Sequence, residues 1–189
     1  HGKSKDKTGA YRVQWTPEQR ILDALDEAFY KAFKYVEPTG LNYLLGVDIS
    51  GSMYGSQCVG SDVLDAATAA GVMALSIAKI EKNHKIMAFT TEFEELNISP
   101  RMRLDTIVKE MYDMSARMGG TDCSLPMQYA MKHNLKCDLF IVLSDNQSWH
   151  GNIHPFQALN EYRHKFNKNS KLVISAFCDN DFSIAQGRE

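Results

Sequence analysis

The sequence lacks long apolar runs, closely spaced cysteines and a positive charge balance, and each absence argues against a class of protein. No apolar stretch among its 189 residues approaches the ~20 residues of a membrane-spanning helix. The four cysteines show no CxxC spacing, which disfavours a zinc site and favours free thiols over a disulfide framework. A formal net charge of -2 gives no support to a domain that binds nucleic acid through its own surface charge.

What the sequence does contain is typical of one globular domain with an extra segment. Hydrophobic residues make up 44% and charged residues 23%, and the length allows a sizeable core. The polar start, residues 1–15, is predicted to be a flexible lead-in. A linker helix is predicted over 16–37, because Thr16 can cap it, Pro17 fits its first turn, and apolar residues follow at helical spacing until Pro38.

Beyond Pro38, strand-like and helix-like segments alternate. Two apolar runs, Leu41 to Val47 and Leu139 to Leu143, are typical of strands buried on both faces of a parallel sheet. Phe93 to Ile98 follows the strand Ile86 to Phe89 after too few residues for a crossover helix, so we expect an antiparallel edge strand. Helices are expected over residues 61–80, 104–111, 124–133 and 155–166, and a last strand over 172–177. This order predicts an α/β fold with a doubly wound, mostly parallel sheet.

Three polar loops are expected at one edge of this sheet, where doubly wound folds bind their ligands. In the first, Asp48, Ser50 and Ser52 alternate along an extended turn, so a carboxylate and two hydroxyls can face one point. In the second loop, two glycines precede Thr121 and give the backbone the freedom to place it at the site. The third loop contains Asp145 after the second apolar strand. This all-oxygen set with few charges predicts a divalent cation site, for Mg²⁺ first and for Mn²⁺ or Ca²⁺ as alternatives.

Each of these residues alone also fits a purely structural role. Serines form turns, and Asp48 or Asp145 could cap a neighbouring segment. Asp122, which follows Thr121, fits an outer position at the metal, a helix cap or a turn equally well. The metal site is favoured because three loops carry suitable residues at the same sheet edge.

The pattern Asp48-x-Ser50-x-Ser52, followed by a Gly-Gly-Thr121 loop and Asp145, resembles the metal-ion-dependent adhesion site of von Willebrand factor A domains. The resemblance covers residues 41 to about 178 and implies a Rossmann-like sheet with one antiparallel edge strand. It implies that both serines bind the metal directly, and that the threonine and the aspartates bind directly or through water. It also implies that an acidic group of a protein partner completes the coordination.

A longer stretch, residues 119–127 (GGTDCSLPM), is similar to the Ro autoantigen family, as are residues 21–37 and 138–142. Members of that family are ring-shaped RNA-binding proteins of small noncoding ribonucleoproteins. The resemblance implies that helical repeats, which this chain lacks, bind Y RNAs and misfolded RNAs, while the A domain closes the ring. On this basis we expect an A domain over 38–189 without its last strand and helix, a monomer, and a cytoplasmic and also nuclear location.

Three functions compete at this point. One is a metal-dependent A domain that captures an acidic group of a protein and has no role with RNA. Another is an interaction domain within an RNA-binding particle, and the two can both hold. A metal-dependent hydrolase is disfavoured, because an aspartyl-nucleophile phosphohydrolase wants an aspartate where Ser50 stands, and no GxSxG elbow occurs. We therefore predict a metal-binding interaction domain of a Ro-like protein, not an enzyme, without membrane contact.

Overall fold

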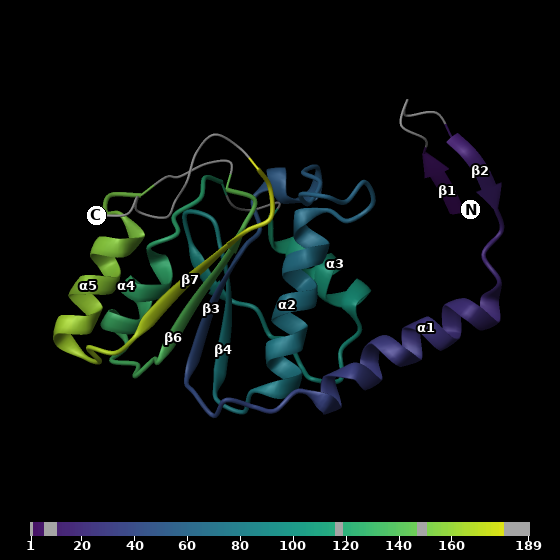
Figure 1. The fold of residues 1–189 in the computed structure, drawn as a ribbon. Helices are drawn as coiled ribbons and strands as arrows, with labels where there is room; N and C mark the ends of the chain where they lie inside the picture. The colour runs from purple at the N-terminus through teal and green to yellow at the C-terminus, as the bar shows by residue number, and fades with distance from the viewer. Residues whose placement is uncertain (1, 6–10, 116–118, 147–150, 180–189) are drawn as a thin grey trace. The chain divides into compact units, whose positions relative to one another are not determined.

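The structure of the chain is a computed structural model that describes residues 2–5, 11–115, 119–146 and 151–179 (Figure 1). Two compact units make up the chain, His1–Glu37 and Pro38–Glu189. The second unit carries all of the predicted metal-site residues. No helix among the described ranges is both long enough and apolar enough to cross a membrane.

The first unit differs from the prediction in two ways. Within the predicted flexible lead-in, the described residues form two strands, because β1 (Gly2–Lys5) pairs antiparallel with β2 (Tyr11–Trp15). The reason is visible in β2, whose sequence alternates aromatic or branched residues with polar ones. Thr16 is also not the helix cap: α1 (Gln19–Ala32) begins after Glu18, whose carbonyl accepts the first helical N–H groups. A short 3₁₀ helix, η1 (Phe33–Tyr35), ends the helical stretch.

The second unit is built on a five-stranded sheet with the order β5-β4-β3-β6-β7 (Figure 1). Its strands are β3 (Tyr43–Asp48), β4 (His84–Phe89), β5 (Phe93–Glu95), β6 (Leu139–Ser144) and β7 (Lys171–Ala176). β3 pairs parallel with both β4 and β6, and β6 pairs parallel with β7. β5 pairs antiparallel with β4. The predicted mostly parallel sheet with one antiparallel edge strand is confirmed.

Helices cover both faces of this sheet (Figure 1). They are α2 (Ala66–Ile80), α3 (Leu104–Ser115), α4 (Leu125–Lys132) and α5 (Pro155–Lys165). Two residues of β7 point to opposite faces of the sheet: Ser175 contacts Met73 of α2, whereas Leu172 packs against the cluster formed with α4 and α5. The prediction of a helix from residue 61 was wrong at its start, because α2 begins only after Asp65, whose carboxylate accepts the Thr68 N–H.

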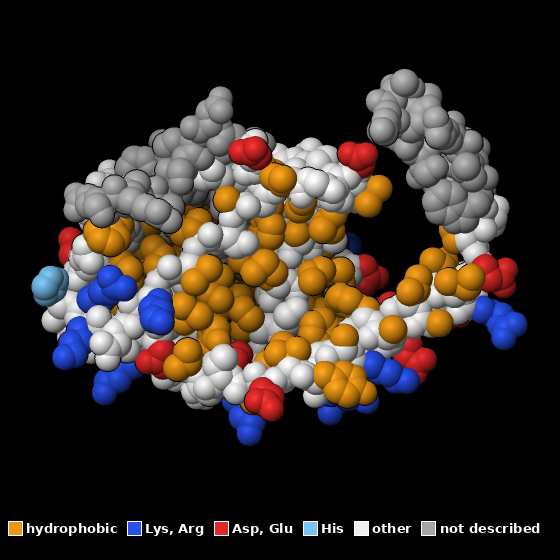
Figure 2. All heavy atoms as spheres, viewed as in Figure 1, with side chains coloured by type: hydrophobic (Ala, Val, Ile, Leu, Met, Phe, Trp, Pro, Cys, Tyr) orange, Lys and Arg blue, Asp and Glu red, His pale blue; other side chains and the backbone are white. Residues whose placement is uncertain are grey.

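The face of the sheet that carries α4 and α5 is tightly packed around aromatic residues. Phe140 of β6 meets Tyr162 of α5 edge to face, and both are fully buried. The opposite face is less completely covered near β7, where Val173 is 46% exposed. Figure 2 shows hydrophobic side chains gathered on this face between β7 and α2.

Candidate metal centre

The candidate site lies at the carboxyl ends of β3 and β6. β3 is linked through α2 to β4 on one side, whereas β6 continues to β7 on the other, so the strand order reverses between β3 and β6. Ligands of open α/β sheets bind at such a switch point, because the loops leave the sheet in opposite directions there. Asp48 ends β3, and Asp145 follows β6 directly.

Asp48 is fully buried and held by two hydrogen bonds. The Ser50 N–H donates to Asp48 Oδ1 at 2.9 Å. The Ser144 hydroxyl donates to Asp48 Oδ2 at 2.7 Å, because the β3–β6 register brings these two strand ends side by side. Each oxygen of the Asp48 carboxylate thus has a fixed direction before any ligand arrives.

The serines of the first loop come together through a change in backbone conformation. Ser50 is extended, and the chain then enters a 3₁₀ helix, η2 (Gly51–Tyr54), which contains Ser52. This turn brings Ser50 Oγ within 3.1 Å of Ser52 Oγ, and both side chains are half-buried. Adjacent oxygen ligands of an octahedral Mg²⁺ lie about 3 Å apart, so the two hydroxyls already have the spacing of neighbouring ligands.

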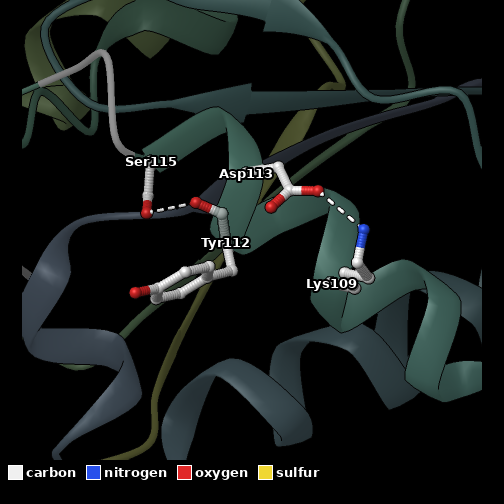
Figure 3. A network of polar contacts seen from close by, with 4 residues as sticks. All are labelled: Lys109, Tyr112, Asp113 and Ser115. Atoms are coloured by element: carbon white, nitrogen blue, oxygen red, sulfur yellow. Dashed lines mark hydrogen bonds and ion pairs between the residues drawn. The ribbon is translucent and has the colours of Figure 1, made fainter.

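Tyr54, the last residue of η2, packs against Tyr112 of α3. The two rings meet edge to face with centroids 5.2 Å apart. Figure 3 shows Tyr112 near the end of α3, where the Ser115 hydroxyl donates to the Tyr112 carbonyl at 2.7 Å. The same turn carries the Lys109–Asp113 ion pair, at 3.1 Å. The Tyr54–Tyr112 contact joins the loop that carries Ser50 and Ser52 to α3.

Thr121 and Asp145 are both buried at the same sheet edge, each 1% exposed. The Thr121 loop is attached to β4, because the Asp122 N–H donates to the Thr90 carbonyl at 2.9 Å and Thr90 directly follows that strand. Gly120 has a φ of +74°, a conformation that glycine adopts without strain. The structure therefore brings Asp48, Ser50 and Ser52 into direct contact and places Thr121 and Asp145 at the same end of the sheet.

The electrostatics of the site favour a cation. Burial raises the pKa of Asp48 to about 6; hydrogen bonds from Ser50 and Ser144 oppose this rise, and the charge of Asp145 adds to it. Two buried carboxylates that repel each other are costly unless positive charge or protons compensate them. Carboxylates and hydroxyls are also the ligands that Mg²⁺ prefers, so the residues present fit a hard divalent cation. Within the described residues, no group of three or more His, Cys, Asp and Glu forms a rival metal site.

Asp122, for which three roles were open, has a turn role in this structure. Its Oδ1 accepts hydrogen bonds from the Ser124 N–H at 2.9 Å and from the Ser124 hydroxyl at 2.6 Å. Gly151 lies directly against this carboxylate, because a Cβ built on Gly151 would be 2.6 Å from Asp122 Oδ1. The Asp122 side chain thus shapes the start of α4.

Ser144 is the site residue that sequence reasoning missed. Within an apolar run it reads as the polar end of a strand, and no spacing in the sequence relates it to Asp48. Its role depends on the register of two parallel strands, which the sequence pattern does not specify. Its oxygen also accepts the Asn146 N–H at 3.1 Å, so Ser144 links Asp48 to the loop that carries Asp145.

Comparison with known proteins shows what the chain as a whole is similar to. The family model described as the Ro60 vWA domain matches residues 42–189. RNA-binding protein RO60 of Deinococcus radiodurans is 37% identical over 171 residues, which cover 90% of this chain and 32% of that protein. RNA-binding protein RO60 of Caenorhabditis elegans is 38% identical over 174 residues, 92% of this chain and 26% of that protein. The crystal structure of the Deinococcus radiodurans RO (RSR) protein matches with a TM-score of 0.80 and 33% identity, over 93% of this chain and 35% of that one.

Proposed function

The chain belongs to the Ro60 vWA domain family, and from this premise we propose that it is the metal-binding interaction domain of an RNA-binding Ro protein. The chain spans about a third or less of the relatives it matches. We therefore propose the activity of a whole Ro protein only for the longer polypeptide. The metal site is the part of that function that this chain's own residues would supply.

The observation that carries the proposal is the arrangement around Asp48. A buried carboxylate whose two oxygens are oriented by Ser50 and Ser144 lies next to a pair of hydroxyls 3.1 Å apart. Asp48, Ser50, Ser52, Thr121 and Asp145 would hold the metal, with Mg²⁺ as the first choice and Mn²⁺ or Ca²⁺ as alternatives. A cation bound by so few charged groups stays electrophilic and can bind an acidic side chain of a protein partner.

RNA recognition belongs, in this proposal, to other parts of the longer protein. The net charge of -2 argues against strong phosphate binding by this chain alone. The relatives are named RNA-binding proteins. We propose that the longer protein binds Y RNAs and misfolded RNAs in ribonucleoprotein particles in the cytoplasm and the nucleus. We also propose that the chain is a monomer, and that it contributes a protein–protein contact and no enzymatic step.

The metal proposal is tested by calorimetric titration of the chain with MgCl₂ and MnCl₂. The variant Asp48→Asn keeps the side-chain volume and removes the charge, so we expect metal affinity to fall below detection. Asp62→Asn makes the same chemical change at an exposed position and should bind metal as the wild type does. Equal Mn²⁺ affinity in the wild type and in Asp48→Asn would refute the assignment of Asp48 as a ligand.

A further inference from the structure

Cys58 and Cys178 are far apart in the sequence and close together in the fold. Cys58 follows η2 on the way to α2, and Cys178 lies just beyond β7. The Val59 N–H donates to the Phe177 carbonyl at 2.9 Å, so the residues that flank the two cysteines are bonded to each other. The Cys178 thiol in turn contacts the Gln57 carbonyl oxygen, with an Sγ–O distance of 3.4 Å.

These contacts limit how far apart the two cysteines can be. Covalent geometry and the Val59–Phe177 hydrogen bond keep the two Cα atoms within ~8 Å of each other. The same reasoning from the Gln57 carbonyl puts Cys178 Sγ within ~6 Å of the Cys58 Cα. A disulfide needs a Cα–Cα distance of about 4.4–6.8 Å, so these limits include the distance that a disulfide requires.

The backbone around Cys58 is fixed in a turn. The Cys58 N–H donates to the Leu64 carbonyl at 2.8 Å, and its carbonyl accepts the Ser61 N–H at 3.0 Å. Both Cys58 and Cys178 are half-buried, whereas Cys123 and Cys137 are buried. A small oxidant can therefore reach the first pair more easily than the other two thiols.

We propose that Cys58 and Cys178 are a redox-active pair that closes into an intramolecular disulfide when a peroxide oxidises the protein. One thiolate attacks hydrogen peroxide to give a sulfenic acid and hydroxide, which takes up a proton to form water. The second thiol then displaces a further water from the sulfenic sulfur and forms the S–S bond. Overall, two thiols lose two electrons and two protons, and one peroxide is reduced to two waters.

The reaction is slow at neutral pH. Burial raises the pKa of the Cys58 thiol, and Asp65 adds to the effect. Burial also raises the pKa of the Cys178 thiol, together with the charges of Asp145 and Cys58. Because the thiolate is the reacting form, the pair responds to sustained oxidation and not to brief exposure.

The disulfide would attach the loop that carries Ser50 and Ser52 to the sheet. The Ser56 N–H donates to the Ser52 carbonyl at 3.0 Å, so the segment that leads to Cys58 is attached to the end of η2. A bond to Cys178 would fasten this segment to the strand next to β6. This inference rests on the positions of the thiols and is independent of whether a metal binds.

The test is oxidation of the 189-residue chain with hydrogen peroxide, followed by thiol titration in denaturant and mass spectrometry of the unreduced digest. We expect the four free thiols of the reduced chain to fall to two, with a peptide that contains both Cys58 and Cys178. Because the bond closes a long loop, the midpoint of thermal unfolding should rise by roughly 5–10 °C and return on reduction. Cys58→Ser and Cys178→Ser should each lack this reversible rise.

Three outcomes of the thiol and crosslink analysis would overturn the proposal. They are four free thiols after prolonged oxidation, a crosslink that involves Cys123 or Cys137 instead, and a dimer joined by an intermolecular bond. A reversible thermal shift of equal size in either serine variant would have the same meaning, since that shift could not come from a Cys58–Cys178 bond.

Discussion

Replacement of Ser144 by alanine tests the structural basis of the candidate metal centre most directly. Ser144 is fully buried, its hydroxyl donates to Asp48 at 2.7 Å, and its oxygen accepts the Asn146 N–H at 3.1 Å. Ser144→Ala removes both contacts without adding atoms. It leaves a buried carboxylate oxygen and a buried N–H without this partner.

The expected magnitude follows from these two contacts. A hydrogen bond to a charged group contributes about 1.5–3 kcal/mol, and one between neutral groups contributes about 0.5–1.5 kcal/mol. Because the contacts share one oxygen and are not additive, we expect Ser144→Ala to lower the free energy of unfolding by about 2–4 kcal/mol. The looser Asp48 carboxylate should also bind Mn²⁺ about 10–100-fold more weakly, as when other residues that orient a metal ligand are removed.

Urea unfolding at pH 7 without metal measures the first effect, and calorimetric titration with MnCl₂ measures the second. Ser170→Ala is the matched control, because Ser170 is also fully buried and its hydroxyl donates to the Cys137 carbonyl near the opposite end of the strands. This control should lose about 1 kcal/mol of stability and keep its metal affinity. If both variants bind Mn²⁺ equally well, the role assigned to Ser144 is wrong.

Two further predictions concern strand β3 and the segment that leads into it. Gly46→Ala would put a Cβ 2.8 Å from Pro126 Cγ, so we expect a loss of about 1–3 kcal/mol in urea unfolding; wild-type stability would show that α4 can move away from β3. Glu81, 6% exposed, accepts the Thr39 N–H at 2.8 Å and the Gly40 N–H at 3.2 Å. Burial opposes ionisation of Glu81, but these hydrogen bonds outweigh it and lower the pKa below its ordinary value. The stability from Glu81 is therefore complete above the unfolded pKa of about 4.3 and is lost as the pH falls through the lower folded pKa. Glu81→Gln should lower stability by about 1–2 kcal/mol at pH 7 and flatten this acid dependence, and an unchanged acid profile would contradict the reasoning.

The sequence by itself determined the fold class of the second unit and the composition of the candidate site. Continuous apolar runs identified β3 and β6, because strands buried on both faces need apolar residues at every position. The short connection before Phe93 required an antiparallel partner for β4. The first loop was predictable as a group of ligands, Asp48, Ser50 and Ser52, because a local turn controls the direction in which these neighbouring side chains point.

Tertiary structure alone decided the features that depend on distant parts of the chain. Ser144 reaches Asp48 through the β3–β6 register, and the Cys178 thiol contacts the Gln57 carbonyl, 121 positions away in the sequence. The start of α2 at Ala66 was also not predicted. A helical pattern of apolar residues begins earlier in the sequence, but the Asp65 carboxylate caps the helix by accepting the Thr68 N–H. Periodicity reports which face of a strand or helix is buried, but not which residues of two strands stand opposite each other. That choice is made when the whole sheet packs, and it orients the Asp48 carboxylate.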